Sequence, residues 1–171
     1  MRSVVLLRGV NVGGRNKVSM ATLADWLRDA GFSSVTTYIQ SGNVVLEHSR
    51  AVDVGAVVHR AIIERTGLDV RVLVTGAAEL REIVDANPYD GVSPTHLHVS
   101  FFECAPDASV LAHLAVTDWS PEEFRVAGRV LYLHLPHGMG RSVMVPRLTV
   151  LKEATTRNWN TVLALSELAS R

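Results

Sequence analysis

The chain has 171 residues, 47% of them hydrophobic, and a mean hydropathy of +0.18. A chain of this size and composition can bury one sizeable core or two small ones, which argues against intrinsic disorder. Its 17 basic and 17 acidic side chains cancel, and this neutral total argues against bulk nucleic-acid binding, which needs many phosphate contacts.

The neutral total conceals a segregation of charge along the chain. Residues 1–17 carry four basic side chains and no acid, a net charge of +4. Residues 18–124 hold fifteen acids and six arginines, a net charge of −9, whereas residues 125–171 hold seven bases and two acids, a net charge of +5. The two basic ends leave room for a local anion-binding pocket, although ordinary surface charge would give the same pattern.

The first half of the chain has the periodicities of a βαββαβ unit. Apolar residues recur with period two in its short segments and with helical spacing in its longer ones. The expected elements are a buried strand (Ser3–Leu7), a helix between Ser19 and Gly31, two strands (Val35–Gln40 and Val44–Glu47), a helix after Asp53 and a last strand (Val70–Val74). This order is that of the ferredoxin-like unit.

The pattern begins again after a linking helix and loop at residues 77–94. The elements expected there are a strand (His96–Glu103), a helix from Pro106 to about Val116, a hairpin around Gly128 and a helical stretch near Val143–Ala154. This order is βαββα, with the last strand replaced by a terminal helix. We therefore predict an α+β protein of two ferredoxin-like (βαββαβ) units, residues 1–76 and 95–171, packed together and with an extra C-terminal helix. Close packing is expected because the linker has no flexible tract.

The connection after the first strand is rich in glycine and in positive charge. Glycine permits positive φ and lets backbone N–H groups converge on an anion, and the polar side chains add further donors. The candidate ligand contacts are Arg8, Asn11, Gly13, Gly14, Asn16 and Lys17. The segment fits neither the P-loop nor the GxGxxG pattern, which argues against a standard NTPase or dinucleotide-binding domain. For Lys17 alone, a solvated loop charge is an equally good interpretation.

A second polar segment forms the expected hairpin between the second and third strands. The first two strands of a split βαβ unit run parallel, so their exits lie at one end of the sheet and bring this hairpin beside the first loop. Tyr38 and Gln40 share a strand face in the predicted pairing. Ser41 and Asn43 offer further hydrogen bonds, although such residues are also common in purely structural turns.

The third polar segment, TTRNWNT, precedes the last helix. Thr155 or Thr156 is expected to cap this helix, and Trp159 to face the core. The first turn of a helix favours an anion and disfavours a cation without a partner. Arg157 could therefore bind a ligand anion through two parallel hydrogen bonds, or pair with an internal carboxylate. The candidate ligand contacts in this segment are Arg157, Asn158 and Asn160.

The segments RGVNVGGRNKVSM, TYIQSGNVV and ATTRNWNTV resemble, in this order, the signature of the bacterial domain of unknown function (DUF) 1697 family. The resemblance extends over nearly the whole chain and implies one composite polar site, without implying an activity. One step departs from the family pattern, which usually has a Ser-Lys-Leu-like sequence after the glycine-rich turn. Here Ser142 is followed by Val143 and Met144, so only Arg141 or Arg147 could replace that lysine.

Other residue types associated with catalysis or metal binding form no convincing pattern. His96 and His98 share a strand face, but no third metal ligand follows at a defined spacing. Cys104 is the only cysteine, which excludes an intrachain disulfide, and it belongs to no nucleophile motif. Glu122 and Glu123 are expected in a solvated turn. We therefore predict no metal site, and the sequence indicates no cofactor.

The leading functional hypothesis is that a composite polar pocket binds a small anionic or nucleotide-like ligand. The alternative is a hydrolase or transferase acting on an anionic substrate, with Lys17 and Arg157 stabilising developing negative charge. No positioned acid, base or nucleophile supports it, so enzymatic activity stays open. A third alternative is a protein-interaction module with purely structural motifs. The apolar run before Arg8 is too short for a signal peptide or a membrane span, so we expect a cytoplasmic protein without a membrane partner; the sequence sets no oligomeric state.

Overall fold

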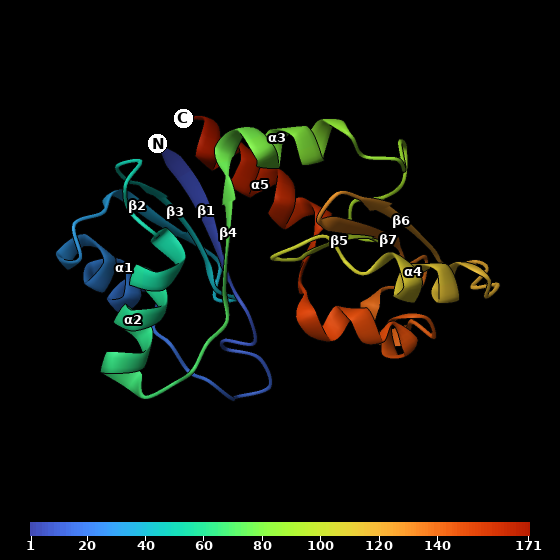
Figure 1. Ribbon diagram of the computed structural model, residues 1–171, viewed down its shortest axis with the longest axis horizontal. Helices are drawn as coiled ribbons and strands as arrows, with labels where there is room; N and C mark the ends of the chain where they lie inside the picture. The colour runs from blue at the N-terminus through green and yellow to red at the C-terminus, as the bar shows by residue number, and fades with distance from the viewer. The chain divides into compact units, whose positions relative to one another are not determined.

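The computed structural model describes the backbone of residues 1–171 and all side chains except those of His113 and Thr149. The chain forms two compact units, one combining residues 1–82 with 165–171 and the other comprising residues 83–164. Each unit has its own four-stranded antiparallel sheet (Figure 1). This division differs from the predicted boundaries because α3 (Ala77–Asp85) and α5 (Trp159–Ser170) each contribute residues to both units.

The first unit contains every element that the sequence predicts for it, in the same order. These elements are β1 (Arg2–Leu7), α1 (Met20–Asp29), β2 (Ser33–Tyr38), β3 (Asn43–Glu47), α2 (Val54–Thr66) and β4 (Val72–Gly76). The strand order in the sheet is β2-β3-β1-β4. Both β1 and β2 run antiparallel to β3, so they are parallel to each other and leave the sheet at the same end.

Local signals explain where the two helices of this unit begin and end. The Ser19 side chain accepts a hydrogen bond from the Thr22 N–H at the start of α1, and Asp53 does the same for the Ala56 N–H at the start of α2. Gly67 ends α2 in the left-handed conformation, with φ of 70°. The sequence predicts a helix after Ser19 and another after Asp53, and each of these residues is the N-cap of its helix.

The core of the first unit lies between its sheet and its two helices, which lie on the same side of the sheet (Figure 1). Alternation along β1 places Val5 and Leu7 in this core, and the apolar faces of the helices pack against them. The buried helical side chains are Met20, Leu23, Ala24 and Leu27 from α1, with Val54, Val58, Ala61 and Ile62 from α2. This packing determines where β1 ends and the glycine-rich connection begins.

The second unit has a corresponding strand order, β6-β7-β5-β8. Its elements are β5 (Leu97–Phe101), α4 (Ala108–Ala115), β6 (Glu123–Ala127), β7 (Val130–His134), the short 3₁₀ helices η1 (Met139–Arg141), η2 (Val145–Arg147) and η3 (Thr149–Glu153), and β8 (Thr155–Asn158). The prediction that a helix replaces the last strand is therefore wrong. The β-branched Thr155 and Thr156 extend along β5, where the hydroxyl groups of Thr156 and Ser100 lie 2.7 Å apart.

One face of the second sheet packs against the segment between β7 and β8. Its buried cluster includes Leu131 and Leu133 from β7 and Met144 and Leu148 from that segment. The ring of Trp159 is buried and lies 6.5 Å from that of Tyr132, which confirms its predicted place in a core. Within the part of the chain that the structure describes, no helix is both long and apolar enough to cross a membrane.

Candidate functional site

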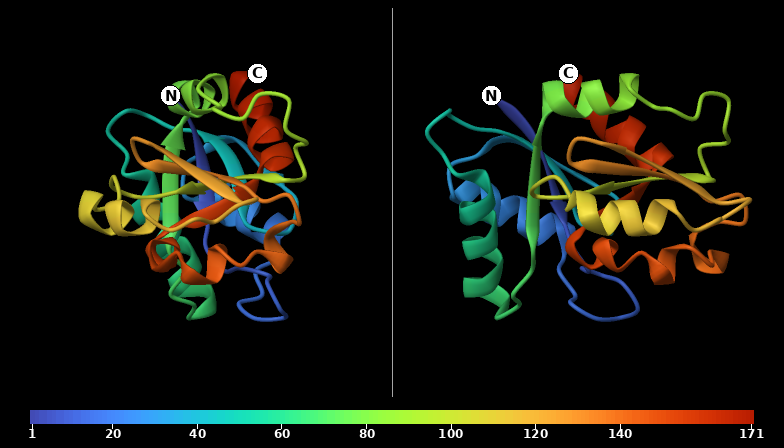
Figure 2. Two further views of the ribbon diagram at one scale, coloured as in Figure 1. Left: turned by 90° about the vertical axis from the view of Figure 1, so that its right-hand side faces the viewer. Right: turned by 45° about the vertical axis from the view of Figure 1, so that its right-hand side comes forward.

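The connection after β1 forms a small hairpin of its own, which extends past the end of the sheet (Figure 2, in blue). Gly13 and Gly14 form its tip with φ of 57° and 74°, and the Arg15 N–H donates to the Val12 carbonyl at 3.1 Å. Positive φ at both central residues is the signature of a type I′ turn. These two glycines are therefore required by the shape of the loop.

Asn11 connects this hairpin to the rest of the unit. Its Nδ2 donates to the carbonyl oxygens of Val18 and Gln40, each at 2.8 Å, and its Oδ1 accepts from the Val18 N–H at 2.9 Å. The amide side chain thus joins the base of the hairpin to the turn between β2 and β3. Its donors and acceptor are already occupied in this arrangement, so its direct contact with a ligand stays a prediction.

The same turn also packs tightly against the end of β1 through Gly42. The Leu7 N–H donates to the Gly42 carbonyl at 2.8 Å. A Cβ atom on Gly42 would lie 2.3 Å from Val10 Cγ2 and 2.7 Å from Leu7 Cβ, and φ is 81°. Only glycine fits this position without movement of its neighbours. The exits of β1 and β2 therefore lie side by side, as the topology predicts.

Two other predicted site residues stabilise the loops themselves. Asn43 is fully buried, and its Nδ2 donates to the Tyr38 carbonyl and to Ser41 Oγ, each at 3.1 Å. Asn16 Nδ2 donates to the Gly9 carbonyl at 3.1 Å. These contacts give both asparagines a structural role, and ligand contact by either one stays a prediction.

The predicted shared face of Tyr38 and Gln40 is not formed. β2 ends at Tyr38, and Ile39 has φ of 48°, which interrupts the alternation of side chains. Gln40 instead lies in the turn with an exposed side chain, and Tyr38 is half-buried.

The loop presents positive charge and hydrogen-bond donors that its own structure does not use. Arg15 and Lys17 are exposed and Arg8 is half-buried, and among the described residues none of the three has a carboxylate partner. The backbone N–H groups of Gly9 and of both tip glycines likewise make no hydrogen bond to the described part of the chain. An anion is the natural partner for this combination.

The third predicted segment belongs to the second unit, and the structure places it differently from the expectation. Asn158 Oδ1 accepts from the Thr161 N–H at 2.9 Å, so Asn158 caps α5 in place of either threonine. Arg157 is a strand residue opposite Val99, and its Nη1 donates to the Thr156 carbonyl at 2.9 Å. Burial lowers the pKa of Arg157 to about 10.

Asn160 is exposed in the first turn of α5. The three candidates of this segment, Arg157, Asn158 and Asn160, therefore lie in a different unit from those of residues 8–43. A composite site made by both sets stays a prediction.

Glu122 is a buried residue that the sequence led us to misplace. It was expected in a solvated turn, yet its carboxylate accepts from Ser142 Oγ at 2.9 Å and from the N–H groups of Val143 and Met144 at 3.1 and 2.8 Å. The neighbouring Glu123 is exposed, and nothing in the sequence distinguishes the two. Glu122 thereby holds the segment in which this chain departs from the family pattern, where Val143 is 59% exposed.

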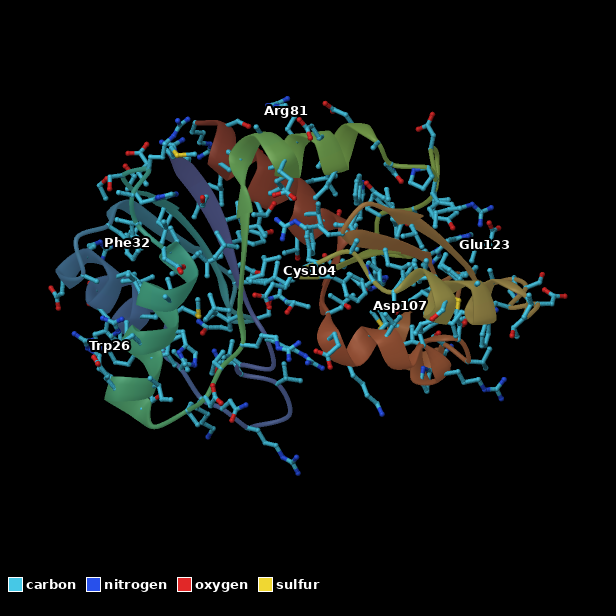
Figure 3. The ribbon with its side chains drawn as sticks, viewed as in Figure 1. Trp26, Phe32, Arg81, Cys104, Asp107 and Glu123 are labelled. Atoms are coloured by element: carbon cyan, nitrogen blue, oxygen red, sulfur yellow. The ribbon has the colours of Figure 1, made fainter. Side chains whose placement is uncertain are left out.

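The histidines and the cysteine of the second unit form no recognisable centre. Burial lowers the pKa of His98, and its Nδ1 makes no hydrogen bond to the described residues. Cys104 is exposed in the connection after β5 (Figure 3). Among the residues with described side chains, no three or more histidine, cysteine, aspartate and glutamate residues are grouped so as to hold a metal ion.

A family model described as a protein of unknown function (DUF1697) matches residues 1–132. The chain belongs to this family. The match includes the hairpin at residues 8–17 and the β2–β3 turn, whose contacts are described above. It ends before the segment at residues 138–144 and before β8, so the third polar segment lies outside the matched range.

The chain is also similar in structure to a conserved bacterial protein, SP0830 from Streptococcus pneumoniae. The TM-score is 0.72 with 20% sequence identity, and the similarity covers 98% of each chain. At this level of identity the likeness shows a common fold. No curated protein matches the sequence.

Proposed function

We propose that the protein binds a small anionic or nucleotide-like ligand at the basic hairpin, defined as residues 8–17, together with the β2–β3 turn, residues 39–42. The observation that carries this proposal is the set of three cations without a carboxylate partner, beside three glycine amides without a hydrogen bond, in the described structure. Hydrogen bonds from cationic groups to phosphate or carboxylate are about twice as strong as neutral ones.

The composition of the hairpin favours binding over chemistry. Residues 8–17 contain no carboxyl, thiol, hydroxyl or imidazole group, so they provide charge and donors without an acid/base pair. Arg8 and Arg15 present planar forks that suit two parallel bonds, whereas Lys17 presents a compact charge. The exposed Gln40 side chain lies in the adjoining turn.

The fold supports this placement of the ligand. We propose a ferredoxin-like classification for both units, supported by the βαββαβ order of the first and the corresponding strand orders of the two sheets. In the first unit the parallel directions of β1 and β2 bring both loops to one end of the sheet. We also propose a cytoplasmic location, where phosphorylated small molecules are abundant.

Calorimetric titration of the full chain with inorganic phosphate and with ADP tests the proposal. Lys17→Ala and Arg15→Ala each remove one exposed cation from the hairpin, and each is expected to weaken binding roughly tenfold, or about 1.4 kcal/mol. Arg60→Ala is the matched control, because Arg60 is an exposed cation on α2 of the same unit. An equal loss in Arg60→Ala, or no heat with either anion at low salt, would contradict the proposal.

A further inference from the structure

The outer edge of β6 is a free edge of the second sheet, because β6 is the terminal strand in the order β6-β7-β5-β8. Its hairpin with β7 turns at two residues, with φ of 55° at Gly128, and Ala127 lies opposite Val130. A two-residue hairpin closes on a hydrogen-bonded pair, and such pairs alternate along the strands. Phe124 and Val126 therefore direct their backbone N–H and C=O groups away from β7.

Two observations support this orientation of the edge. Arg125 Nη1 donates to the Phe124 carbonyl at 2.9 Å, so a side chain reaches an oxygen that β7 does not use. A hollow of about 570 Å³ is bordered by residues 123–126 of β6 and by the connection from α4. Consecutive strand residues point to opposite faces, so a space that touches all four of them runs along the edge.

The charges along this edge favour one antiparallel self-pairing. Glu123 and Arg125 are exposed and lie on the same face, with Nη2 and Oε2 3.3 Å apart (Glu123 is labelled in Figure 3). Three registers let the outward backbone groups pair between copies, centred on Phe124, Arg125 or Val126. The first places Glu123 opposite Arg125 of the other copy twice, the second places Arg125 opposite itself, and the third places Arg125 opposite the uncharged Ala127. Opposite charges stabilise a cross-strand pair and like charges destabilise it.

We propose that β6 pairs antiparallel with β6 of a second copy of this chain, in the register centred on Phe124. The second-unit sheet of one copy and that of the other then form one continuous sheet. Each Phe124 N–H donates to the Phe124 carbonyl of the other copy, and each Arg125 guanidinium moves from its own strand to Glu123 of the other copy. The exposed edge is thereby covered, which removes a site of uncontrolled strand pairing.

Sedimentation velocity of the full chain with single and combined charge reversals tests this dimer. Arg125→Glu and Glu123→Arg each place two like-charged pairs across the interface, so each is expected to weaken self-association about tenfold or more. An equimolar mixture of the two variants restores opposite charges in both pairs, and it is expected to associate at least as well as the wild type. The double variant, carrying both reversals in one chain, is expected to do the same.

Val126→Pro tests the backbone contribution separately. In this register Val126 lies opposite Glu122 of the other copy. Proline at position 126 removes the outward N–H of that pair and leaves the ladder to β7 complete, so it is expected to weaken the dimer while the melting temperature changes little. Near-UV circular dichroism checks that each variant is folded. A wild type that stays monomeric at its highest soluble concentration, or a dimer that neither reversal weakens, would overturn the inference. Failure of the mixed variants to associate would overturn it as well.

Discussion

The two units share a strand order but differ at the connection after their first strand. In the first unit this connection runs from residue 8 to residue 19 and carries three cations and no acid. In the second unit it runs only from residue 102 to residue 107 and carries Glu103 and Asp107 with no cation. The same topology thus carries first-strand connections of opposite charge, which is why the proposed anion site is assigned to the first unit.

The units also differ in how they hold their later loops. The β2–β3 turn of the first unit presses Gly42 against Leu7 and Val10, whereas a Cβ on Gly128 in the β6–β7 turn would meet nothing within 4 Å. The first unit covers its sheet with α2, a regular helix between β3 and β4. The second unit has three short 3₁₀ helices at the corresponding place, and Glu122 accepts hydrogen bonds from residues 142–144, between the first and second of them. Close packing thus holds the β2–β3 turn of the first unit, whereas a buried carboxylate holds the segment between β7 and β8 of the second.

The largest expected effect is the loss of stability when alanine replaces Gly42 in the β2–β3 turn, compared with Gly128 in the β6–β7 turn. Gly42→Ala meets two atoms at under 3 Å and has positive φ, so we expect it to destabilise the protein by about 4 kcal/mol. Gly128→Ala has the positive φ without the contacts, and we expect about 1 kcal/mol. Urea unfolding of both variants measures the difference. Equal losses would show that Gly42 is not held against the end of β1.

A smaller effect is expected from the acidic pair at the start of β6. Glu122→Gln places an amide donor near two backbone N–H groups and a hydroxyl, so it should cost about 2 kcal/mol. Glu123→Gln changes an exposed side chain and should cost less than about 0.5 kcal/mol. Thermal unfolding of the two variants tests this order. A Glu122→Gln variant as stable as the wild type would mean that the carboxylate does not hold the segment at residues 142–145.

The smallest expected effects on stability come from removing the hydroxyl groups of two buried tyrosines in the second unit, Tyr89 and Tyr132. The hydroxyl of Tyr132 donates to the Ile83 carbonyl at 2.6 Å, whereas that of Tyr89 is buried and has no hydrogen-bond partner among the described side chains and backbone. Tyr132→Phe should therefore destabilise by about 1 kcal/mol, and Tyr89→Phe should stabilise by about the same amount. Denaturant unfolding at pH 7 gives both values. A loss of stability in Tyr89→Phe would show that its hydroxyl has a partner in solution.

Because of the same two tyrosines, we expect the protein to lose stability at alkaline pH. Burial raises the pKa of both Tyr89 and Tyr132 to about 12, above the ordinary value of 10.0. The unfolded chain therefore ionises first, so their stabilising contribution is complete below pH 10 and is lost as the pH rises towards 12. Unfolding free energies measured across this range should fall, and they should fall less steeply in Tyr89→Phe.

The sequence predicts the first unit well because its signals are local. The apolar periodicity of the two helices and their starts after Ser19 and Asp53 depend on neighbouring residues, and the structure confirms them. β8 was missed because four residues are too few to show a period, and because its strand character depends on pairing with β5. The burial of Glu122 was missed because it also depends on residues distant in the sequence: its hydrogen-bond partners lie about twenty residues away.

The neighbouring positions of the two loops were predictable from the sequence, but the contacts made by their side chains were not. Parallel strand directions brought the basic hairpin and the β2–β3 turn together, as the topology implies. The engagement of Asn11 and Asn43 in internal bonds could not be read from their types, because asparagine serves loops and ligands equally well. The hairpin groups that the structure does not use internally are the N–H groups of its glycines and its three cationic side chains.

The most direct test of this account is a two-dimensional ¹H–¹⁵N NMR titration with inorganic phosphate, which reports both first-strand connections at once. The amide signals of Gly9, Gly13 and Gly14 are expected to shift with saturating, salt-sensitive curves, while those of residues 103–107 in the second unit stay in place. Lys17→Ala should weaken these shifts and Arg60→Ala should leave them unchanged. Shifts of similar size in both connections, or none in the glycine amides, would contradict the assignment of the anion site to the basic hairpin.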